Sequence, residues 1–140
     1  MKHRPKYIYV ILFFIIAAIL SVLCLYIINA VKSSVKLISH DSFFNDFSVI
    51  EDKVYIKCHI VLRNDSNKEE SVKLRANMEE DTSNGLLKSP IVYGYNRNGT
   101  DEFLVPANST KGYSVSFIGD FAGNEEKLTR ELPFIEIISQ

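Results

Sequence analysis

The feature that most constrains this chain is an apolar run near its start, Tyr7 to Val31 (YIYVILFFIIAAILSVLCLYIINAV). It holds no charged residue, and only Ser21 and Asn29 are clearly polar. A helix needs about 20 apolar residues to cross the hydrocarbon core of a bilayer, and basic residues before such a helix keep the N-terminus in the cytoplasm. We therefore expect a basic cytoplasmic segment at 1–6, a transmembrane helix acting as signal anchor at 7–31, a short linker at 32–34 and an extracytoplasmic domain at 35–140.

Two alternatives to the anchor place the protein differently. A cleaved signal peptide, which would make the protein secreted, has an apolar region of about 7–15 residues and small residues at its cleavage site. This run is longer, and the best candidate site has bulky Ile28 two residues before Ala30. A lipid anchor on Cys24 is the third reading, but Leu23 is too large for the position before such a cysteine. We favour the uncleaved anchor, in which residues 7–31 contact the lipid bilayer, because the length of the run matches bilayer thickness.

After the anchor the sequence changes to short runs rich in Val, Ile, Phe and Tyr, separated by Asn, Asp, Ser, Gly and Pro. This pattern is typical of an all-β sandwich or barrel. A chain of 140 residues has room for one compact domain, and we predict no helix after residue 31. The expected strands are Val35–Ser39, Phe47–Ile50, Val54–Arg63, Ser71–Met78, Leu86–Lys88, Ile91–Tyr95, Glu102–Val105, Gly112–Ile118 and Phe134–Ile138.

The turn residues agree with this strand pattern. Asn98-Gly99 is the strongest hairpin signal, because a type I′ turn needs a positive φ at both central residues. The segment 119–130 predicts a longer loop or one short helical turn. Together these elements predict an all-β fold, an immunoglobulin-like β-sandwich preceded by one N-terminal transmembrane helix.

Cys58 and His59 stand side by side within a predicted strand and raise the question of a reactive pair. Successive side chains of a strand point to opposite faces, so Cys58 belongs to an apolar stripe from Val54 to Leu62, whereas His59 lies on the wetter face. We therefore interpret Cys58 as a core residue. Because the other cysteine is Cys24, in the apolar run, no disulfide can form within the exported domain.

The composition argues against most chemistries. All 17 acidic residues and 13 of the 16 basic residues follow residue 31, so this part carries a net charge of −4 and offers no basic stripe for nucleic acid. No nucleophile elbow or glycine-rich phosphate loop is present, so we predict no enzyme, no catalytic residues and no cofactor. The histidines are too scattered for a transition-metal site. The alternative function is an exported metal- or small-ligand-binding domain, with calcium at the acidic loop Met78–Gly85 through Glu79 to Asp81.

Two sets of surface residues deserve naming as candidates. Tyr93 and Tyr95 share one face of the strand 91–95 and precede Arg97, and these residue types are enriched at binding hot spots. The competing interpretation, which we prefer, is that both tyrosines cover the core, since aromatic residues are ordinary strand formers. Three Asn-x-Ser/Thr sequons fall in predicted turns, where a eukaryotic cell would find them accessible; they begin at Asn64, Asn98 and Asn108.

The stretches VYIKCHIVLRNDSNKEESVKL and FLVPANSTKGYSVSF, a strand ending in an Asn-rich turn and a Pro-closed turn before an alternating strand, carry a resemblance. With the anchor, they resemble membrane-anchored or lipoprotein-borne immunoglobulin-like domains of Gram-positive bacterial cell-surface proteins. The strand-to-Asn turn also resembles the late-embryogenesis-type sandwich of some anchored plant proteins. The resemblance implies an adhesion, scaffold or accessory module. We therefore expect a single-pass membrane protein that binds a membrane-protein or cell-envelope partner.

Overall fold

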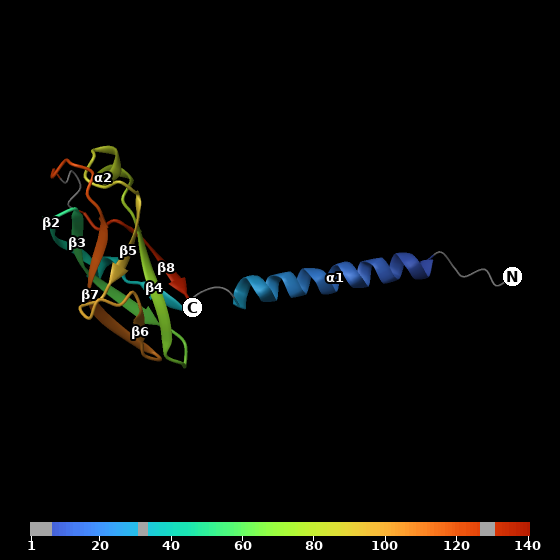
Figure 1. Cartoon of the computed structure of the whole chain (residues 1–140). Coiled ribbons are helices and arrows are strands. Elements are labelled where there is room, and N and C mark those ends of the chain that lie inside the picture. Colours follow the sequence, from blue (N-terminus) through green and yellow to red (C-terminus); the bar gives the residue numbers. More distant parts are fainter. Residues whose placement is uncertain (1–6, 31–33, 127–130) are drawn as a thin grey trace. The chain divides into compact units, whose positions relative to one another are not determined.

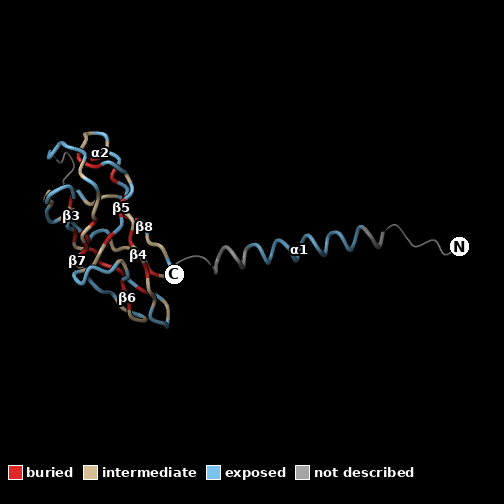
Figure 2. The backbone as a smooth tube through the Cα atoms, viewed as in Figure 1, coloured by how far each residue is buried: buried red, intermediate tan, exposed pale blue. Residues whose placement is uncertain are grey.

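The computed structural model describes residues 7–30, 34–126 and 131–140, and the side chains of residues 7–9 and 25–30 stay outside that description. The chain divides into two compact units, Met1–Lys32 and Ser33–Gln140. The first contains helix α1, Tyr7–Ala30, whose described side chains are all exposed (Figure 2). Among the described residues, no helix combines the length and apolar character needed to cross a membrane. The predicted cytoplasmic segment 1–6, Val31, and all of the linker 32–34 except Ser34 fall outside the described residues.

The second unit is built on eight antiparallel strands (Figure 1). The all-β prediction is confirmed for this unit, and most strands lie where the sequence placed them, several of them longer at one or both ends. The strands are β1 Val35–Leu37, β2 Phe43–Ile50, β3 Lys53–Asn64, β4 Glu70–Asn77, β5 Ile91–Tyr95, β6 Phe103–Val105, β7 Ser109–Asp120 and β8 Phe134–Ser139.

The strands form one curled sheet in the order β1-β3-β7-β5-β4-β6. Strand β2 pairs with β3 beside β1, and β8 pairs with β4. The short strand β5 links the two halves, because Tyr93–Tyr95 pairs with β7 and Ile91–Tyr93 pairs with β4. The curl brings β1 close to β8, so both halves turn one face towards a common interior. The immunoglobulin-like sandwich stays a prediction.

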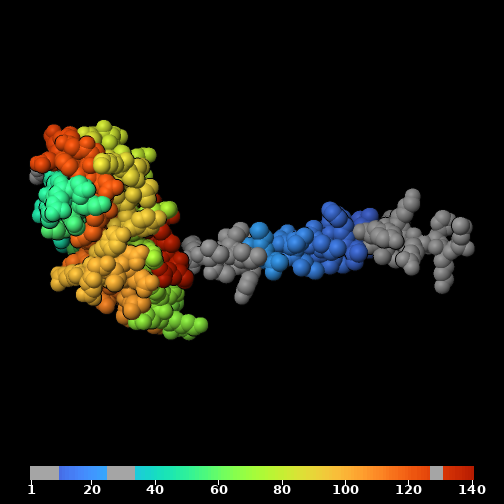
Figure 3. All heavy atoms as spheres, in the orientation of Figure 1, coloured from blue at the N-terminus to red at the C-terminus, as the bar shows by residue number. Residues whose placement is uncertain are grey.

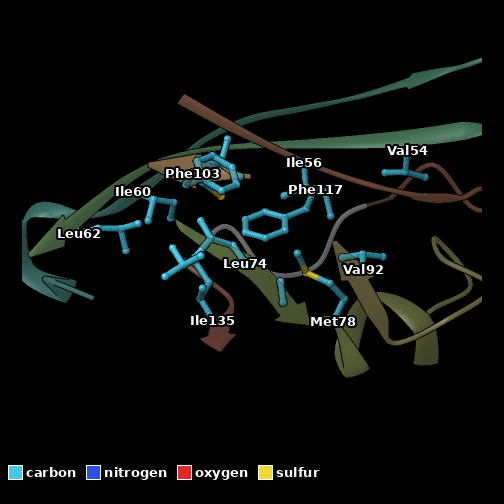
Figure 4. Packing of buried hydrophobic residues seen from close by; sticks show 14 of the residues in the cluster. Val54, Ile56, Ile60, Leu62, Leu74, Met78, Val92, Phe103, Phe117 and Ile135 are labelled. Atoms are coloured by element: carbon cyan, nitrogen blue, oxygen red, sulfur yellow. The ribbon is translucent and has the colours of Figure 1, made fainter. Parts of the chain in front are cut away.

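The interior is lined by alternate residues of the long strands. On β3 the stripe from Val54 to Leu62 is almost fully buried, with Cys58 only 1% exposed, which confirms its assignment to the core. Figure 4 shows side chains of β3 and β7 facing those of β4 and β8, with the Phe117 ring near Leu74. Fully burying one such side chain contributes about 1.5–3 kcal/mol. The unit therefore carries its own core.

Three local predictions are wrong. Helix α2, Glu79–Ser83, replaces the expected acidic loop. The Asn77 side chain accepts a hydrogen bond from the Glu79 amide (3.1 Å) at the start of the helix. The acidic residues in the first turn also interact favourably with the helix dipole. Leu86–Lys88 makes only one bridge, Leu87 to Phe121, so it is no strand. Strand β7 begins at Ser109, before the predicted start at Gly112, because residues 109–111 pair with β3.

The Asn98-Gly99 turn also differs from the prediction. Gly99 has φ +78°, but Asn98 is not among the residues with positive φ, so the turn is not type I′. The flanking strands β5 and β6 do not pair with each other: β5 lies between β7 and β4, and β6 pairs with β4. The dipeptide correctly predicted a turn. The hairpin pairing of β5 with β6 that it implied is wrong, because each of these strands pairs instead with strands distant in sequence.

Candidate functional site: an open basic hollow

The surface of the β unit has an open hollow of about 770 Å³. It lies where β3, β6, β7 and the β5–β6 turn (residues 96–102) meet, and we name it the basic hollow. Figure 3 shows the yellow-to-orange surface of the β5–β6 segment continuous with that of β7. Its lining residues are His59, Asn96, Arg97, Asn98, Thr100, Glu102, Phe103, Leu104, Lys111, Gly112, Tyr113 and Ser114.

Gly112 has no side chain, and this leaves room on β7 for the imidazole ring of His59. A Cβ on Gly112 would lie 2.8 Å from Cε1 and 2.9 Å from Nε2 of His59, closer than real contacts allow. The imidazole therefore lies across β7 at this point, and the Phe43 ring stacks on it with centroids 5.1 Å apart and an angle of 28°. No hydrogen bond joins the ring nitrogens of His59 to another described residue.

The β5–β6 turn is held by the side chain of Asn96. Its Oδ1 accepts hydrogen bonds from the amides of Asn98 (2.9 Å) and Thr100 (3.2 Å). Its Nδ2 donates to Thr100 Oγ1 and to the carbonyl of Glu102 (3.0 Å). This network orders the turn so that Arg97 Nη2 reaches across to donate to Ser114 Oγ on β7 (3.0 Å).

Tyr113 lines the basic hollow and is held in place by two contacts with β6. Its hydroxyl donates to the carbonyl of Leu104, and its ring meets Phe103 edge-on with centroids 5.6 Å apart. Burial, with a smaller effect from the negative charge of Glu69, raises the pKa of Tyr113 to about 12. The phenol therefore stays protonated at physiological pH. Lys111 Nζ lies 5.2 Å from the centroid of this ring, within the range of a cation–π contact.

Two cations and one acid line the basic hollow. Arg97 and Lys111 form no ion pair with a described acid, and Glu102 is the one acid among the lining residues. By contrast, several cations elsewhere each contact a carboxylate: Lys36, Lys53, Arg63, Lys73 and Arg75. Arg97 and Lys111 thus lack a described ion-pair partner, as Lys57, Lys68 and Lys88 do elsewhere on the domain.

The three predicted interaction residues do not form one site. Arg97 lines the basic hollow, but neither tyrosine does. The preferred interpretation that both tyrosines cover the core is wrong for Tyr93, which is 43% exposed, since the opposite face of β5, with Val92, points inward. On the outer face Tyr93 lies between Ile118 and Arg75 across the strands, while Tyr95 is half-buried beside Ser116. Their role in binding stays a prediction.

Two further predictions concern polar residues of turns. The Asn64 side chain is 1% exposed and fully hydrogen-bonded, so the expected accessibility of its sequon is wrong, whereas Asn98 and Asn108 are exposed. At the proposed calcium loop Glu79 and Glu80 are exposed while Asp81 is buried in α2. Within the part of the chain that the structure describes, no group of three or more His, Cys, Asp or Glu side chains could hold a metal ion.

Sequence reasoning missed most of the basic hollow. It placed His59 on the wetter face of its strand, which the structure confirms, but it did not connect that residue with Lys111 or Ser114. These residues meet because His59 pairs with Ser114 in the β3–β7 ladder, at a sequence separation that no local pattern encodes. The alternation of β7 could have placed Ser114 on the outer face, although not beside a particular partner.

No protein-family model, curated protein or solved structure matches this chain.

Proposed function

We propose that this protein is a single-pass membrane protein whose β domain, of immunoglobulin-like type, acts outside the cell by binding a membrane-protein or cell-envelope partner. The observation that carries the proposal is the uncharged apolar run Tyr7 to Val31, preceded by the basic residues of segment 1–6. Such a run is the signature of a signal anchor with a cytoplasmic N-terminus. The resemblance to Gram-positive surface domains points to the same role.

The character of the β domain supports binding as its mode of action. Its basic hollow is open to solvent and ordered by hydrogen bonds of Asn96 and Tyr113, so a ligand meets a surface that is already organised. Preorganised polar groups cost little ordering entropy on binding. Arg97 and Lys111 bring charges that a partner can neutralise.

Membrane anchorage is tested by fractionating cells that express the full chain and extracting the membranes with alkaline carbonate. The wild-type protein should stay in the membrane pellet, with its C-terminal domain open to protease added outside intact cells. A double substitution, Ile16→Arg with Ile19→Arg, should release or mislocalise it, because each arginine at a helix centre costs about 3 kcal/mol of insertion free energy. The matched control, Ile16→Leu with Ile19→Leu, should behave as wild type.

Binding is tested by cross-linking the full-length protein in its native membrane and identifying what copurifies in detergent. One stoichiometric membrane or envelope partner is the expected result. Tyr93→Ala and Arg97→Ala, tested separately, then show whether the outer face of β5 or the basic hollow contacts that partner. Carbonate-soluble wild-type protein, or recovery of the protein alone, contradicts the proposal.

A further inference from the structure

We propose that strand β2 binds an extended, basic segment of a partner protein, which joins the curled sheet as an additional strand. This inference deepens the proposed binding function and rests on it, because it states how the partner is held. It is drawn from the free edge of β2, the half-covered apolar side chains beside that edge, and the acidic residues along it.

Strand β2 has a partner strand on one side only. Among the described strands it pairs with β3 alone (Figure 1). Proteins protect such edges by shortness, by proline or by lysine, yet β2 is eight residues long and contains neither proline nor lysine. The edge strand β8 is shorter, with six residues, and lies close to β1. The one irregularity of β2 is a bulge between Phe44 and Asp46, so its regular edge runs from Asp46 to Ile50. An unprotected edge of this kind is a template for a strand from another chain.

The register of the β2–β3 hairpin identifies the backbone groups that point to the free edge. Ile50 and Lys53 flank a two-residue turn, and the flanking pair of such a hairpin exchanges hydrogen bonds. Hydrogen-bonded positions alternate along an antiparallel pair, so the N–H and C=O groups of Phe47 and Val49 point away from β3. No hydrogen bond joins these outward groups to another described residue. They are therefore free to pair with an incoming strand.

The side chains at this edge are apolar and incompletely covered. Phe47 and Val49 pack against the core from the inner face of β2, yet both are only half-buried. On the outer face Ile50 is 55% exposed. An added strand would place its inward side chains beside Phe47 and Val49, since cross-strand neighbours lie about 4.5–5.5 Å apart. The bound segment should therefore carry apolar residues at alternate positions.

Charge determines the other face of the segment. The stretch 37–52 contains no lysine or arginine, and its four acidic residues are all exposed: Asp41, Asp46, Glu51 and Asp52. The cations Lys53 and Lys57 stand on β3, across β2 from the free edge, and Lys57 faces Asp46 in the register without forming an ion pair. A second copy pairing through the same edge would bring like charges together, which destabilises cross-strand pairs. A segment with basic residues at the remaining alternate positions complements the acids.

The experiment titrates a capped peptide of four Val-Lys repeats into the full chain held in a non-ionic detergent, and follows the backbone amides by NMR. Binding should slow hydrogen exchange at the amides of Phe47 and Val49 about tenfold, because the added strand accepts their hydrogen bonds. The Ser48 amide, which faces β3, should change little. A peptide of four Pro-Lys repeats carries the same charge without strand-forming N–H groups at every second position, and it should protect neither amide. Four Val-Glu repeats should not bind.

Variants of β2 locate the binding. Val49→Pro removes an outward N–H and leaves the ladder to β3 intact, so it should fold and weaken the affinity about tenfold. Asp46→Asn should weaken it about threefold, the effect of one exposed ion pair. The matched control is Glu125→Gln, which removes an exposed acid outside β2 and should change nothing. The peptides and Asp46→Asn keep the test valid even where Val49→Pro does not fold. No protection of Phe47 and Val49 at millimolar Val-Lys peptide, equal protection by the Pro-Lys peptide, or an equal loss in Glu125→Gln overturns the proposal.

This failure is distinguishable from failure of the proposed function. A chain that stays anchored and captures a partner, yet shows no protection of Phe47 and Val49 by the Val-Lys peptide, keeps its proposed function and loses only strand addition at β2. A chain that binds the peptide at β2 but leaves the membrane on carbonate extraction keeps the binding edge and loses the anchor.

Discussion

Two turns of the β unit are built around an asparagine in the same way, yet they differ in burial. Asn64 ends β3, and its side chain accepts from the Ser66 amide (2.9 Å) and from Ser34 Oγ (3.3 Å) while donating to the carbonyls of Lys68 (2.7 Å) and Val105 (3.0 Å). Asn96 follows β5 and likewise accepts two hydrogen bonds and donates two. Asn64 is 1% exposed, whereas Asn96 is partly exposed.

The difference in burial gives the two networks different tasks. The carbonyl of Val105 belongs to β6, so Asn64 joins the end of β3 to a strand that otherwise pairs with β4. Water cannot readily replace the bond to Val105, because it is buried from solvent. The bonds of Asn96 stay within its own turn, where water can replace them, and their effect is to place Arg97 at the basic hollow. One network therefore stabilises the fold, and the other orders a surface.

The substitution Asn64→Ala should have the largest effect on stability, and it tests whether the buried network stabilises the fold. Loss of the donor bonds leaves the buried Val105 carbonyl without this partner and weakens the part-buried contact to Lys68, and we expect the free energy of unfolding to fall by about 3 kcal/mol. Urea denaturation followed by circular dichroism measures the change. Asn67→Ala removes an exposed asparagine from the same turn and should change stability by less than about 0.5 kcal/mol. Equal losses in the two variants would contradict the role of the buried amide.

Asn96→Ala should cost less, about 1.5 kcal/mol, because solvent reaches the groups that it leaves unpaired. The same urea titration gives the value, with Asn98→Ala as the control, since the side chain of Asn98 makes no hydrogen bond to a described residue. A larger loss of unfolding free energy in Asn96→Ala than in Asn64→Ala would mean that the turn of Asn96, and not that of Asn64, contributes more to the stability of the fold.

The two turns also show how far the sequence predicts this structure. Alternation within β3 predicts which residues enter the core, and both Asn-rich segments predict turns, because these signals are local. The burial of Asn64 depends on β6, and the pairing of β5 depends on β7, so neither follows from neighbouring residues. The sequence did not predict helix α2, because its acidic residues are as common in a loop as in the first turn of a helix. The basic hollow, which brings together residues from His59 to Ser114, could not be assembled without the strand order.

Two glycines allow a finer test: Gly99 in the β5–β6 turn and Gly112, which lines the basic hollow. Gly99 has φ +78° with no atom near an added Cβ, so Gly99→Ala should cost about 1 kcal/mol through backbone strain alone. Gly99→Asn should recover part of that loss, since asparagine tolerates this conformation. Thermal unfolding measures both.

Gly112→Ala tests steric contact instead of backbone strain, because the new Cβ would displace the His59 ring. Its loss of stability should shrink when His59→Ala is added, whereas the loss caused by Gly99→Ala should not change. Additive effects in the double variant of Gly112 and His59 would show that the imidazole does not lie over Gly112.

The smallest expected effect concerns the carboxylates beside the two turns. Lys36 and Arg63 lower the pKa of Asp65 from its ordinary value of 3.8, and Lys73, with a smaller effect of a backbone hydrogen bond, lowers the pKa of Asp101. A lowered folded-state pKa adds stability that is present above the unfolded value and is lost as the pH falls through the folded value. Both carboxylates are partly exposed, so the contribution is small and screened by salt.

Asp65→Asn should therefore reduce the steepness with which stability falls below about pH 4, where aspartate takes up its proton, and Asp101→Asn should reduce it less. Urea midpoints measured between neutral and acid pH at low and high salt provide the test. Asp46→Asn, which removes an exposed aspartate without an ion pair to a described residue, serves as the control. Because Asp65 binds two cations and Asp101 one, a larger effect of Asp101→Asn would mean that the turn of Asn96 contributes more to acid stability than the turn of Asn64.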